Sequence, residues 1–318
     1  MSSTAPMLGV YLSDSLDLDA IYGEALRQGA EDIVLRHPHE IDHPEDVRFA
    51  ICWLPDEQAF DAYPNLSLAM SIGAGVDALL AHPGLDDSVR IARVRDPHQA
   101  DLMAGFAAHE VLHREREFAT LERQAVDRHW APLPMRAPAE ATVAVLGHGT
   151  MGRAVVQALA ALGFGVRVAC RRHPESPVEG VTYLTGEEAV KEAAKDADYL
   201  INVLPLTATT ENVLDEELLA RLAPGAWLVQ IGRGEHLVEG DLLKALDGGH
   251  LAGASLDVFR EEPLPKAHPF WQDARLRITP HIASDSLPEV VAMQVIETAR
   301  ALRDDQPLAM GIDRRQGY

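Results

Sequence analysis

The segment 141–152, with the sequence ATVAVLGHGTMG, is the feature that most constrains the fold of this chain of 318 residues. Its apolar first half ends in three spaced glycines, Gly147, Gly149 and Gly152, and a helix-forming segment follows directly at 153–162. In such a strand–turn–helix pattern the first glycine makes a tight turn, the second lets a pyrophosphate approach the backbone, and the third packs helix on strand. The N–H groups and dipole of the helix N-terminus then favour phosphate. The order of these parts predicts a dinucleotide site.

The residues after the next apolar strand indicate which dinucleotide is bound. NAD-binding units place Asp or Glu about 20 residues after the glycines, where the carboxylate holds the ribose 2′-hydroxyl. Here the predicted strand 165–169 is followed by Cys170, Arg171 and Arg172, without an acid. Because arginine forks match phosphate bidentately, we expect both arginines to bind a 2′-phosphate, with NADPH preferred and NADH a weaker alternative. Two solvated surface arginines are the other interpretation.

Length and composition narrow the class of protein. A chain of 318 residues suits two domains, and 47% hydrophobic content is that of a soluble protein. No segment approaches the roughly 20 apolar residues of a membrane span, and residues 1–10 lack the pattern of a secretory leader. Cys52 and Cys170 make neither a disulfide framework nor a metal-ligand spacing. These features predict a cytoplasmic protein.

The charge balance bears on partners. The chain has 49 acidic and 28 basic residues, for a formal net charge of −21. That charge argues against nucleic acid and anionic membranes. NADPH and small acids are anions too, so their sites must carry local positive charge.

Apolar runs alternate with helical patterns through most of the chain. This alternation predicts an α/β fold of doubly wound, largely parallel sheets. The expected strands form one set at 8–12, 33–35, 49–53, 68–72 and 89–92, and a second at 143–146, 166–169, 199–203, 227–231, 252–256 and 277–279. A long helical stretch at 100–128 and a proline-rich connection at Pro132, Pro134 and Pro138 separate the two sets, and a final helix is expected at 288–303.

The long helical stretch contains one motif that suggests metal. His109, Glu110 and His113 match the H-E-x-x-H pattern, in which two histidines one turn apart bind zinc beside a glutamate base. Such a short pattern arises easily by chance among 14 histidines, and no clear third ligand follows. We interpret it as a solvated helix face and expect no metal; a zinc site is the least favoured alternative.

Three polar segments each follow a predicted strand of the second set. They carry Arg233 within 229–235, Glu262 within 256–263, and His281 within 278–284. Ligands of open α/β sheets bind at the carboxyl ends of the strands, so these side chains are expected at one edge. Singly, each has an ordinary explanation as a surface charge, a loop carboxylate or a structural histidine. In this order behind a nucleotide fingerprint, they indicate an acid–base set.

At this point the chain resembles the D-isomer-specific 2-hydroxyacid dehydrogenase family, and within it the glyoxylate/hydroxypyruvate reductase A branch. The resemblance covers nearly the whole chain. The family motifs stand at 147–152, 203–207, 232–234, 257–263 and 280–281, and the branch motifs at 72–77, 130–134, 264–265 and 313–318. The 19-residue gap between Glu262 and His281 also looks like that branch.

The resemblance implies two Rossmann-like domains with a cleft between them. Residues 1–98 and 287–318 would form a discontinuous substrate domain, and residues 99–286 the NADP-binding domain. It further implies a homodimer, in which an arm at about 100–138, bearing Trp130, embraces the nucleotide domain of the partner.

The resemblance also implies roles for individual residues. His281 would donate a proton to the 2-oxo oxygen, Glu262 would stabilise the charged imidazole, and Arg233 would grip the substrate carboxylate and polarise its carbonyl. Backbone N–H groups of Ala74 and Gly75 would bind the same carboxylate. Further cofactor contacts are expected from residues of the second domain: Thr150, Met151, Leu204, Pro205, Ile231 and Asp257, the last on the nicotinamide carboxamide. Trp53 would wall the substrate pocket, or else be a core aromatic.

These expectations define one leading function and two alternatives. The leading one is NADPH-dependent reduction of small 2-oxo acids, glyoxylate to glycolate and hydroxypyruvate to D-glycerate. The first alternative is a reductase of a bulkier 2-oxo acid such as phenylpyruvate. The second is a nucleotide-sensing binding protein of the corepressor type, which shares the fold and triad.

Overall fold

The computed structural model describes residues 6–314 and divides into two compact units. Unit 1 comprises Met1–His98 and Asp285–Tyr318, and unit 2 comprises Gln99–Ser284. The second boundary lies two residues before the position expected from the sequence. Residues 1–5 and 315–318, which include parts of the two terminal segments discussed above, lie outside the described residues.

Unit 1 is built on a five-stranded parallel sheet with the strand order β2-β1-β3-β4-β5. Its strands are β1 (Met7–Ser13), β2 (Ile33–Arg36), β3 (Val47–Trp53), β4 (Leu68–Ser71) and β5 (Arg90–Arg93). Its helices are α1 (Leu18–Gly29), the short α2 (Asp77–Leu80) and α9 (Pro288–Arg303), and the last has the bounds expected from the sequence.

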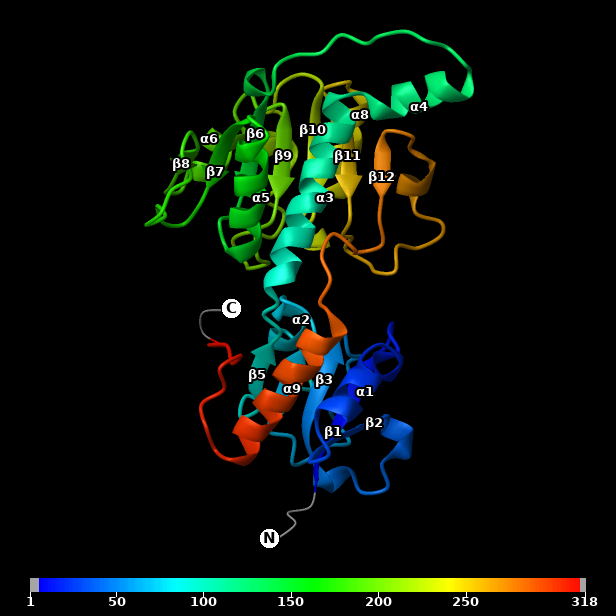
Figure 1. Ribbon diagram of the computed structural model, residues 1–318, viewed down its shortest axis with the longest axis vertical. Helices are drawn as coiled ribbons and strands as arrows, with labels where there is room; N and C mark the ends of the chain where they lie inside the picture. Colours follow the sequence, from blue (N-terminus) through cyan, green and yellow to red (C-terminus); the bar gives the residue numbers. More distant parts are fainter. Residues whose placement is uncertain (1–5, 315–318) are drawn as a thin grey trace. The chain divides into compact units, whose positions relative to one another are not determined.

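Alternate residues of these strands pack on opposite faces of the sheet. Phe49 and Ile51 of β3 join a core with α1 and α9, whereas Ala50 and Cys52 of the same strand face a core with Leu79 of α2. This alternation follows from the two-residue period of a strand. Helix α9 therefore completes unit 1 although it comes last in the sequence, as Figure 1 shows.

Unit 2 is built on a seven-stranded parallel sheet with the order β12-β11-β10-β9-β6-β7-β8. Its strands are β6 (Thr142–Leu146), β7 (Gly165–Ala169), β8 (Thr182–Leu184), β9 (Tyr199–Asn202), β10 (Ala226–Gln230), β11 (Leu251–Leu256) and β12 (Leu276–Ile278). Its helices are α3 (Pro97–Glu115, which begins in unit 1), α4 (Phe118–Val126), α5 (Thr150–Ala161), α6 (Ala189–Ala194), α7 (Glu216–Leu219) and α8 (Glu239–Asp247).

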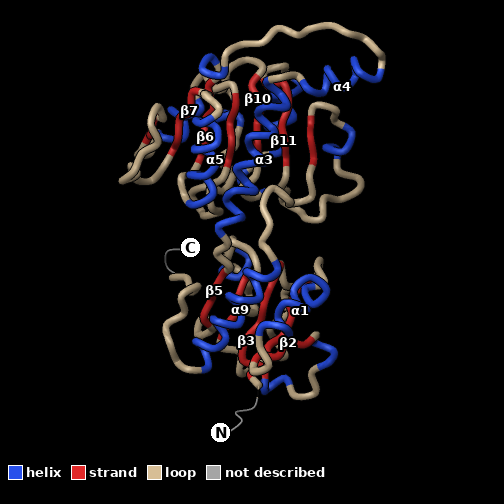
Figure 2. Tube along the Cα trace, in the orientation of Figure 1, coloured by secondary structure: helices blue, strands red, loops and turns tan. Residues whose placement is uncertain are grey.

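Helices cover both faces of this sheet, which confirms the doubly wound α/β class. Side chains of α3 and α5 pack on one face, and those of α6, α7 and α8 on the other. Figure 2 shows the strands as one layer between helices in each unit. The edge strand β8 was not expected, and α5 begins at Thr150 rather than at Arg153.

The stretch expected as one long helix is divided. Helix α3 ends at Glu115, and Glu117 has a φ of 49°, which breaks the helix before α4. The chain after α4 then arches back to β6 (Figure 1). We call residues 116–135 the α4 excursion. An ion pair joins its two ends, because Arg136 donates from Nε and Nη2 to the two carboxylate oxygens of Glu115 at 2.7 and 2.9 Å.

In the H-E-x-x-H segment, Glu110 makes a buried structural contact. The interpretation of this segment as a solvated helix face is therefore wrong for Glu110. Glu110 is only 3% exposed. Its carboxylate accepts from the Ser255 hydroxyl on β11 and from Arg277 Nε on β12 at 2.8 Å. Glu110 therefore joins α3 to two strands of the sheet, whereas the His109 side chain of the same motif is 58% exposed.

We predict that Glu110→Gln lowers the free energy of unfolding by about 1–3 kcal/mol, because the buried Ser255 hydroxyl and the partly exposed Arg277 lose a charged acceptor. Burial would raise the pKa of Glu110, but hydrogen bonds from Ser255 and Arg277 hold it below its ordinary value. A depressed carboxyl pKa contributes stability above the unfolded pKa, about 4.3 for Glu, and loses it as the pH falls through the folded value. The measurement is urea denaturation of wild type and variant at pH 7 and below pH 4.

The difference in the free energy of unfolding between wild type and Glu110→Gln should be largest at pH 7 and should decrease below pH 4. Glu192→Gln, an exposed change on α6, is the matched control and should leave the urea midpoint unchanged. A Glu110→Gln midpoint equal to wild type at pH 7 would show that the contact is dispensable.

Among the described residues, no helix combines the length and apolar character that a membrane crossing requires.

Candidate active site

Three neighbouring strands of unit 2 end beside one another and carry the predicted acid–base residues. Strands β12, β11 and β10 are adjacent and parallel. Arg233 follows β10, Glu262 follows β11, and His281 follows β12. The polar residues therefore lie in loops after the carboxyl ends of adjacent strands, the edge at which open α/β sheets bind ligands.

Glu262 and His281 are in direct contact. The Nδ1 atom of His281 lies 2.7 Å from Glu262 Oε2. The other carboxylate oxygen accepts from the backbone N–H of Phe259 at 2.9 Å, so the carboxylate is fixed on both sides. Because an ionised carboxylate only accepts, we assign the Nδ1 proton to the imidazole. In this tautomer the Nδ1 proton faces the carboxylate of Glu262.

Asp257 holds the loop that carries His281. His281 has a φ of 55°, in the left-handed region that non-glycine residues seldom adopt. The buried carboxylate of Asp257 accepts from the Thr279 hydroxyl at 2.6 Å and from the backbone N–H groups of Ile282 and Ala283, each at 2.9 Å. A strained backbone persists where its surroundings over-determine it. The structure thus gives Asp257 a positioning contact that the sequence did not suggest.

A buried polar network fixes the loop that carries Arg233. Asn202 and Gln230 end β9 and β10, and with His236 they are fully buried. His236 Nδ1 accepts from the Arg233 backbone N–H at 3.1 Å, while Gln230 Nε2 donates to the Arg233 carbonyl at 2.8 Å. Asn202 Nδ2 donates to Gln230 Oε1 at 2.8 Å. The backbone of Arg233 is therefore held on both its N–H and its carbonyl.

Sequence reasoning missed Asn202, Gln230 and His236. A signal for two of them was present, because each is a polar residue that ends an otherwise apolar, buried strand. Buried polar groups occur where their hydrogen bonds are met, and here the partners are the loop backbone and one another. His236 also lies 3.3 Å from the Pro205 carbonyl, so the network joins the Arg233 loop to the loop after β9.

The glycine fingerprint has the geometry of a dinucleotide cradle. Gly147 has a φ of 104°, and a Cβ at Gly152 would lie 2.2 Å from the Gly147 carbonyl oxygen. A Cβ at Gly149 would meet nothing within 4 Å, so the approach to the N-terminus of α5 is open. That N-terminus has no side-chain cap. The residues present therefore fit a bound pyrophosphate.

Arg171 and Arg172 lie after β7, next to the fingerprint strand, and both are exposed. His148, inside the fingerprint, packs edge-on against Tyr183 of β8 with ring centroids 5.0 Å apart. Its Nε2 atom is buried and has no hydrogen-bond partner within residues 6–314. Burial, followed by the charge of Arg153, lowers the pKa of this imidazole. The carboxyl ends of β6 and β7 thus hold both cationic and unsatisfied polar groups.

The other predicted nucleotide residues line the same edge of the sheet. Thr150 and Met151 begin α5, Leu204 and Pro205 follow β9, and Ile231 follows β10. The Leu204 backbone N–H donates to Asn202 Oδ1 at 3.2 Å, which orients this turn. All five belong to unit 2, as do the three residues of the acid–base set.

The predicted substrate residues of unit 1 also gather at strand ends. Trp53 ends β3, and Ala74 and Gly75 follow β4, the adjacent strand. Trp53 packs on this turn, since a Cβ at Gly73 would lie 2.9 Å from its ring. Within the described residues, no recorded hydrogen bond uses the backbone N–H of Ala74 or Gly75 as donor. These N–H groups are suited to bind an anion.

Comparison with known proteins decides the family. Residues 109–283 match the model of the "D-isomer specific 2-hydroxyacid dehydrogenase, NAD binding domain". The chain belongs to the D-isomer-specific 2-hydroxyacid dehydrogenase family. It is an NAD(P)-dependent enzyme of that family, and the resemblance inferred from the motifs is confirmed.

Individual members of the family are similar to this dehydrogenase over most of its length. It is 39% identical over 282 residues to a glyoxylate/hydroxypyruvate reductase A of Serratia proteamaculans, covering 87% of this chain and 89% of that one. Its fold matches a crystal structure of a family member from Xanthobacter autotrophicus in complex with NADPH and MES, with 34% identity, a TM-score of 0.86, and coverage of 99% of this chain and 100% of that chain. An NADPH-dependent glyoxylate/hydroxypyruvate reductase from Sinorhizobium meliloti, in complex with NADP and sulfate, matches at 28% identity, a TM-score of 0.87 and the same coverage.

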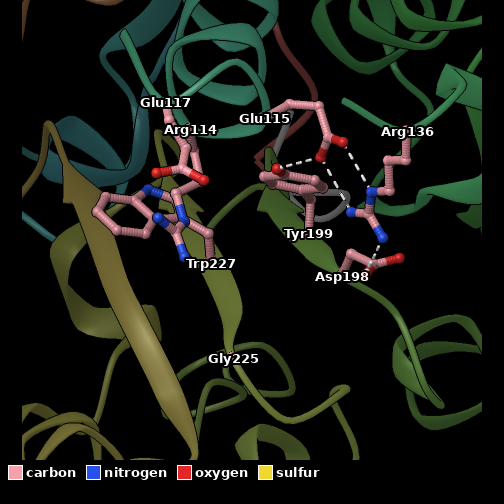
Figure 3. A pocket seen from close by; sticks show the side chains of 8 residues that line it. All are labelled: Arg114, Glu115, Glu117, Arg136, Asp198, Tyr199, Gly225 and Trp227. Atoms are coloured by element: carbon pink, nitrogen blue, oxygen red, sulfur yellow. Dashed lines mark hydrogen bonds and ion pairs between the residues drawn. The ribbon is translucent and has the colours of Figure 1, made fainter. Parts of the chain in front are cut away.

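A separate pocket of about 170 Å³ lies at the opposite edge of the unit 2 sheet. Figure 3 shows the residues that line it: Arg114, Glu115, Glu117, Arg136, Asp198, Tyr199, Gly225 and Trp227. Tyr199 and Trp227 stand at the amino ends of β9 and β10, away from the catalytic loops. Because Arg136 and Tyr199 both donate to Glu115 here, the pocket contains the ion pair that closes the α4 excursion.

Within residues 6–314, no cluster of three or more His, Cys, Asp or Glu side chains has the geometry to hold a metal ion.

Proposed function

We propose that this dehydrogenase reduces small 2-oxo acids with NADPH, glyoxylate to glycolate and hydroxypyruvate to D-glycerate. The observation that carries the proposal is the contact of 2.7 Å between Glu262 and His281. Their loops follow β11 and β12, and the loop of Arg233 follows β10, the strand next to β11. The names of the Serratia and Sinorhizobium relatives support the substrate class.

The residues divide the chemistry among them. His281, protonated on both nitrogens, donates from Nε2 to the developing alkoxide, while Glu262 stabilises the imidazolium at Nδ1. Arg233 grips the substrate carboxylate through its planar fork and polarises the carbonyl. The backbone N–H groups of Ala74 and Gly75 bind the same carboxylate, and Trp53 walls the pocket.

The nucleotide is assigned to the cradle formed by the glycines and the start of α5. NADPH, when bound, supplies the hydride for the carbonyl carbon. Thr150 and Met151 would bind its pyrophosphate with their backbone N–H groups, Leu204, Pro205 and Ile231 would line the nucleotide, and Asp257 would hold the carboxamide. Arg171 and Arg172 would pair with the 2′-phosphate.

A panel of initial rates tests the proposal. Glyoxylate, hydroxypyruvate and phenylpyruvate are each measured with NADPH and with NADH. We expect kcat/KM with NADPH to be at least about tenfold higher for the two small acids than for phenylpyruvate, the scale on which pocket size discriminates. A preference for phenylpyruvate would favour the bulkier-substrate enzyme. Absence of turnover with all three would favour the binding protein.

Removal of both arginines tests the cofactor assignment. Each charged hydrogen bond contributes about 1.5–3 kcal/mol, and about 1.4 kcal/mol corresponds to tenfold. We therefore expect Arg171→Ala/Arg172→Ala to weaken NADPH binding at least tenfold and to leave NADH binding nearly unchanged. The measurement is kcat/KM for both cofactors, with Lys195→Ala, an exposed change elsewhere in unit 2, as the control. A wild-type enzyme that already prefers NADH would contradict the assignment of the two arginines to the 2′-phosphate.

The proposal extends to a cytoplasmic homodimer. In the α4 excursion, Val126, Trp130 and Met135 are exposed to 83%, 100% and 70%. Large apolar side chains grouped on one protruding segment are typical of a protein interface. We propose that this arm packs on a second copy of the chain. Light scattering should then give twice the chain mass, and a monomer would contradict the proposal.

The proposed cytoplasmic location agrees with the cysteines. Cys52 and Cys170 are buried and outside any disulfide, which suits a reducing compartment.

A further inference from the structure

Arg93 stands immediately behind the turn to which the proposed function assigns the substrate carboxylate. It ends β5, and it pairs in register with Ser71, the last residue of β4. From there its Nη1 donates to the Ala74 carbonyl at 2.9 Å. The guanidinium therefore binds a carbonyl oxygen of the turn. The N–H groups of Ala74 and Gly75, to which the substrate carboxylate is assigned, belong to the same turn.

No ion pair with a described residue compensates the charge of Arg93. The side chain is half-buried, and its Nε is buried with no hydrogen-bond partner in the described part of the chain. No carboxylate within residues 6–314 forms an ion pair with it. Burial, followed by the charge of Arg95, lowers the pKa of Arg93. Holding a partly buried cation beside a second arginine costs stability, so its presence requires another explanation.

The turn itself is prepared for an anion. Gly73 N–H donates to the Ser71 hydroxyl at 3.2 Å, which fixes the start of the turn. The hydrogen bond from Arg93 fixes the Ala74 peptide oxygen toward the protein, and the next peptide N–H, that of Gly75, belongs to the same rigid plane.

We propose that Arg93 is a positioning residue for substrate binding: it orients the Ala74–Gly75 peptide toward the substrate carboxylate and supplies a compensating positive charge behind it. This inference rests on the proposed function. It also explains how a chain with a formal net charge of −21 attracts a small anion, because a local cation of low solvent exposure is screened less than surface charges.

Three substitutions separate the two contributions of Arg93. Arg93→Met removes charge and donor, Arg93→Gln keeps an amide donor without charge, and Arg93→Lys keeps the charge. We expect KM for glyoxylate to rise at least about tenfold in the Met and Gln variants, with kcat changed less, and about threefold or less in the Lys variant. Arg90→Gln, an exposed change at the other end of β5, is the control and should leave KM unchanged.

Stability and binding distinguish this role from a structural one. Because Arg93 forms no ion pair among residues 6–314, Arg93→Met should melt at or above the wild-type Tm, and its Kd for NADPH should be unchanged. The probe of the anion site is oxalate, titrated calorimetrically into enzyme saturated with NADP⁺. Its Kd should rise at least about tenfold in Arg93→Met.

The outcomes separate the inference from the proposed function. Wild type that binds oxalate but reduces no 2-oxo acid contradicts the proposed function alone. Wild type that turns over, with an Arg93→Met variant that keeps KM and oxalate affinity within twofold, overturns the role of Arg93. A lower Tm with KM and kcat impaired alike in the Met, Gln and Lys variants also overturns it, in favour of a structural role.

Discussion

Replacement of His281 by alanine is expected to reduce kcat for glyoxylate by about two to four orders of magnitude, the usual effect of losing a general acid. The imidazole Nδ1 lies 2.7 Å from Glu262, and we propose that Nε2 donates the proton. NADPH binding should be nearly unaffected, since the nucleotide cradle is formed by other residues. The measurements are kcat from steady-state rates and Kd for NADPH from fluorescence titration.

Two further results bear on this assignment. His281→Gln should be as inactive as the alanine variant, because an amide cannot deliver a proton at neutral pH. Glu262→Gln should lose less, since it removes the partner of the acid and not the acid itself. If kcat of His281→Ala stays within a few-fold of wild type, His281 is not the acid.

Replacement of Arg233 by lysine is expected to reduce kcat/KM for the oxo acid by about 100-fold. An ammonium group keeps the charge but cannot make two parallel hydrogen bonds to a carboxylate. Two charged hydrogen bonds at about 1.5 kcal/mol each give about 3 kcal/mol, or about two decades. The backbone of Arg233 is held by Gln230 and His236, so the variant should keep the loop.

Thermal unfolding checks that assumption, because Arg233→Lys should melt within a few degrees of wild type. Arg90→Lys, an exposed change on β5, provides a same-type exchange for comparison and should keep kcat/KM for the oxo acid. An Arg233→Lys variant with wild-type kcat/KM would remove Arg233 from the substrate site.

The parts of the fold predicted from sequence are those set by local pattern. The strand of the fingerprint is a continuous apolar run and the helix Pro288–Arg303 has a helical pattern of buried residues, so their type and place could be read from the residues. Glu262 and His281 were expected at the same edge of the sheet because the carboxyl ends of parallel strands meet there, and the family resemblance implied their pairing. By contrast, β8 is a three-residue edge strand with the burial of a loop, and no pattern of that length is distinctive.

The features missed from sequence depend on tertiary contacts. The break at Glu117 has neither proline nor glycine, so local propensity gives no warning of its positive φ. Glu110 is buried because Arg277 and Ser255, more than 140 residues away in sequence, supply its partners. Asp257 and His236 show their positioning contacts only once the loops are folded.

We propose that this chain transfers a hydride from NADPH to a 2-oxo acid and makes the D-hydroxy acid. The direct test is incubation with hydroxypyruvate and NADPH deuterated at C4 on the transferred face, followed by chiral analysis and mass spectrometry of the product. The account predicts D-glycerate with one deuterium at C2 from wild type, and essentially none from His281→Ala. L-glycerate, or glycerate without deuterium at C2, would contradict it.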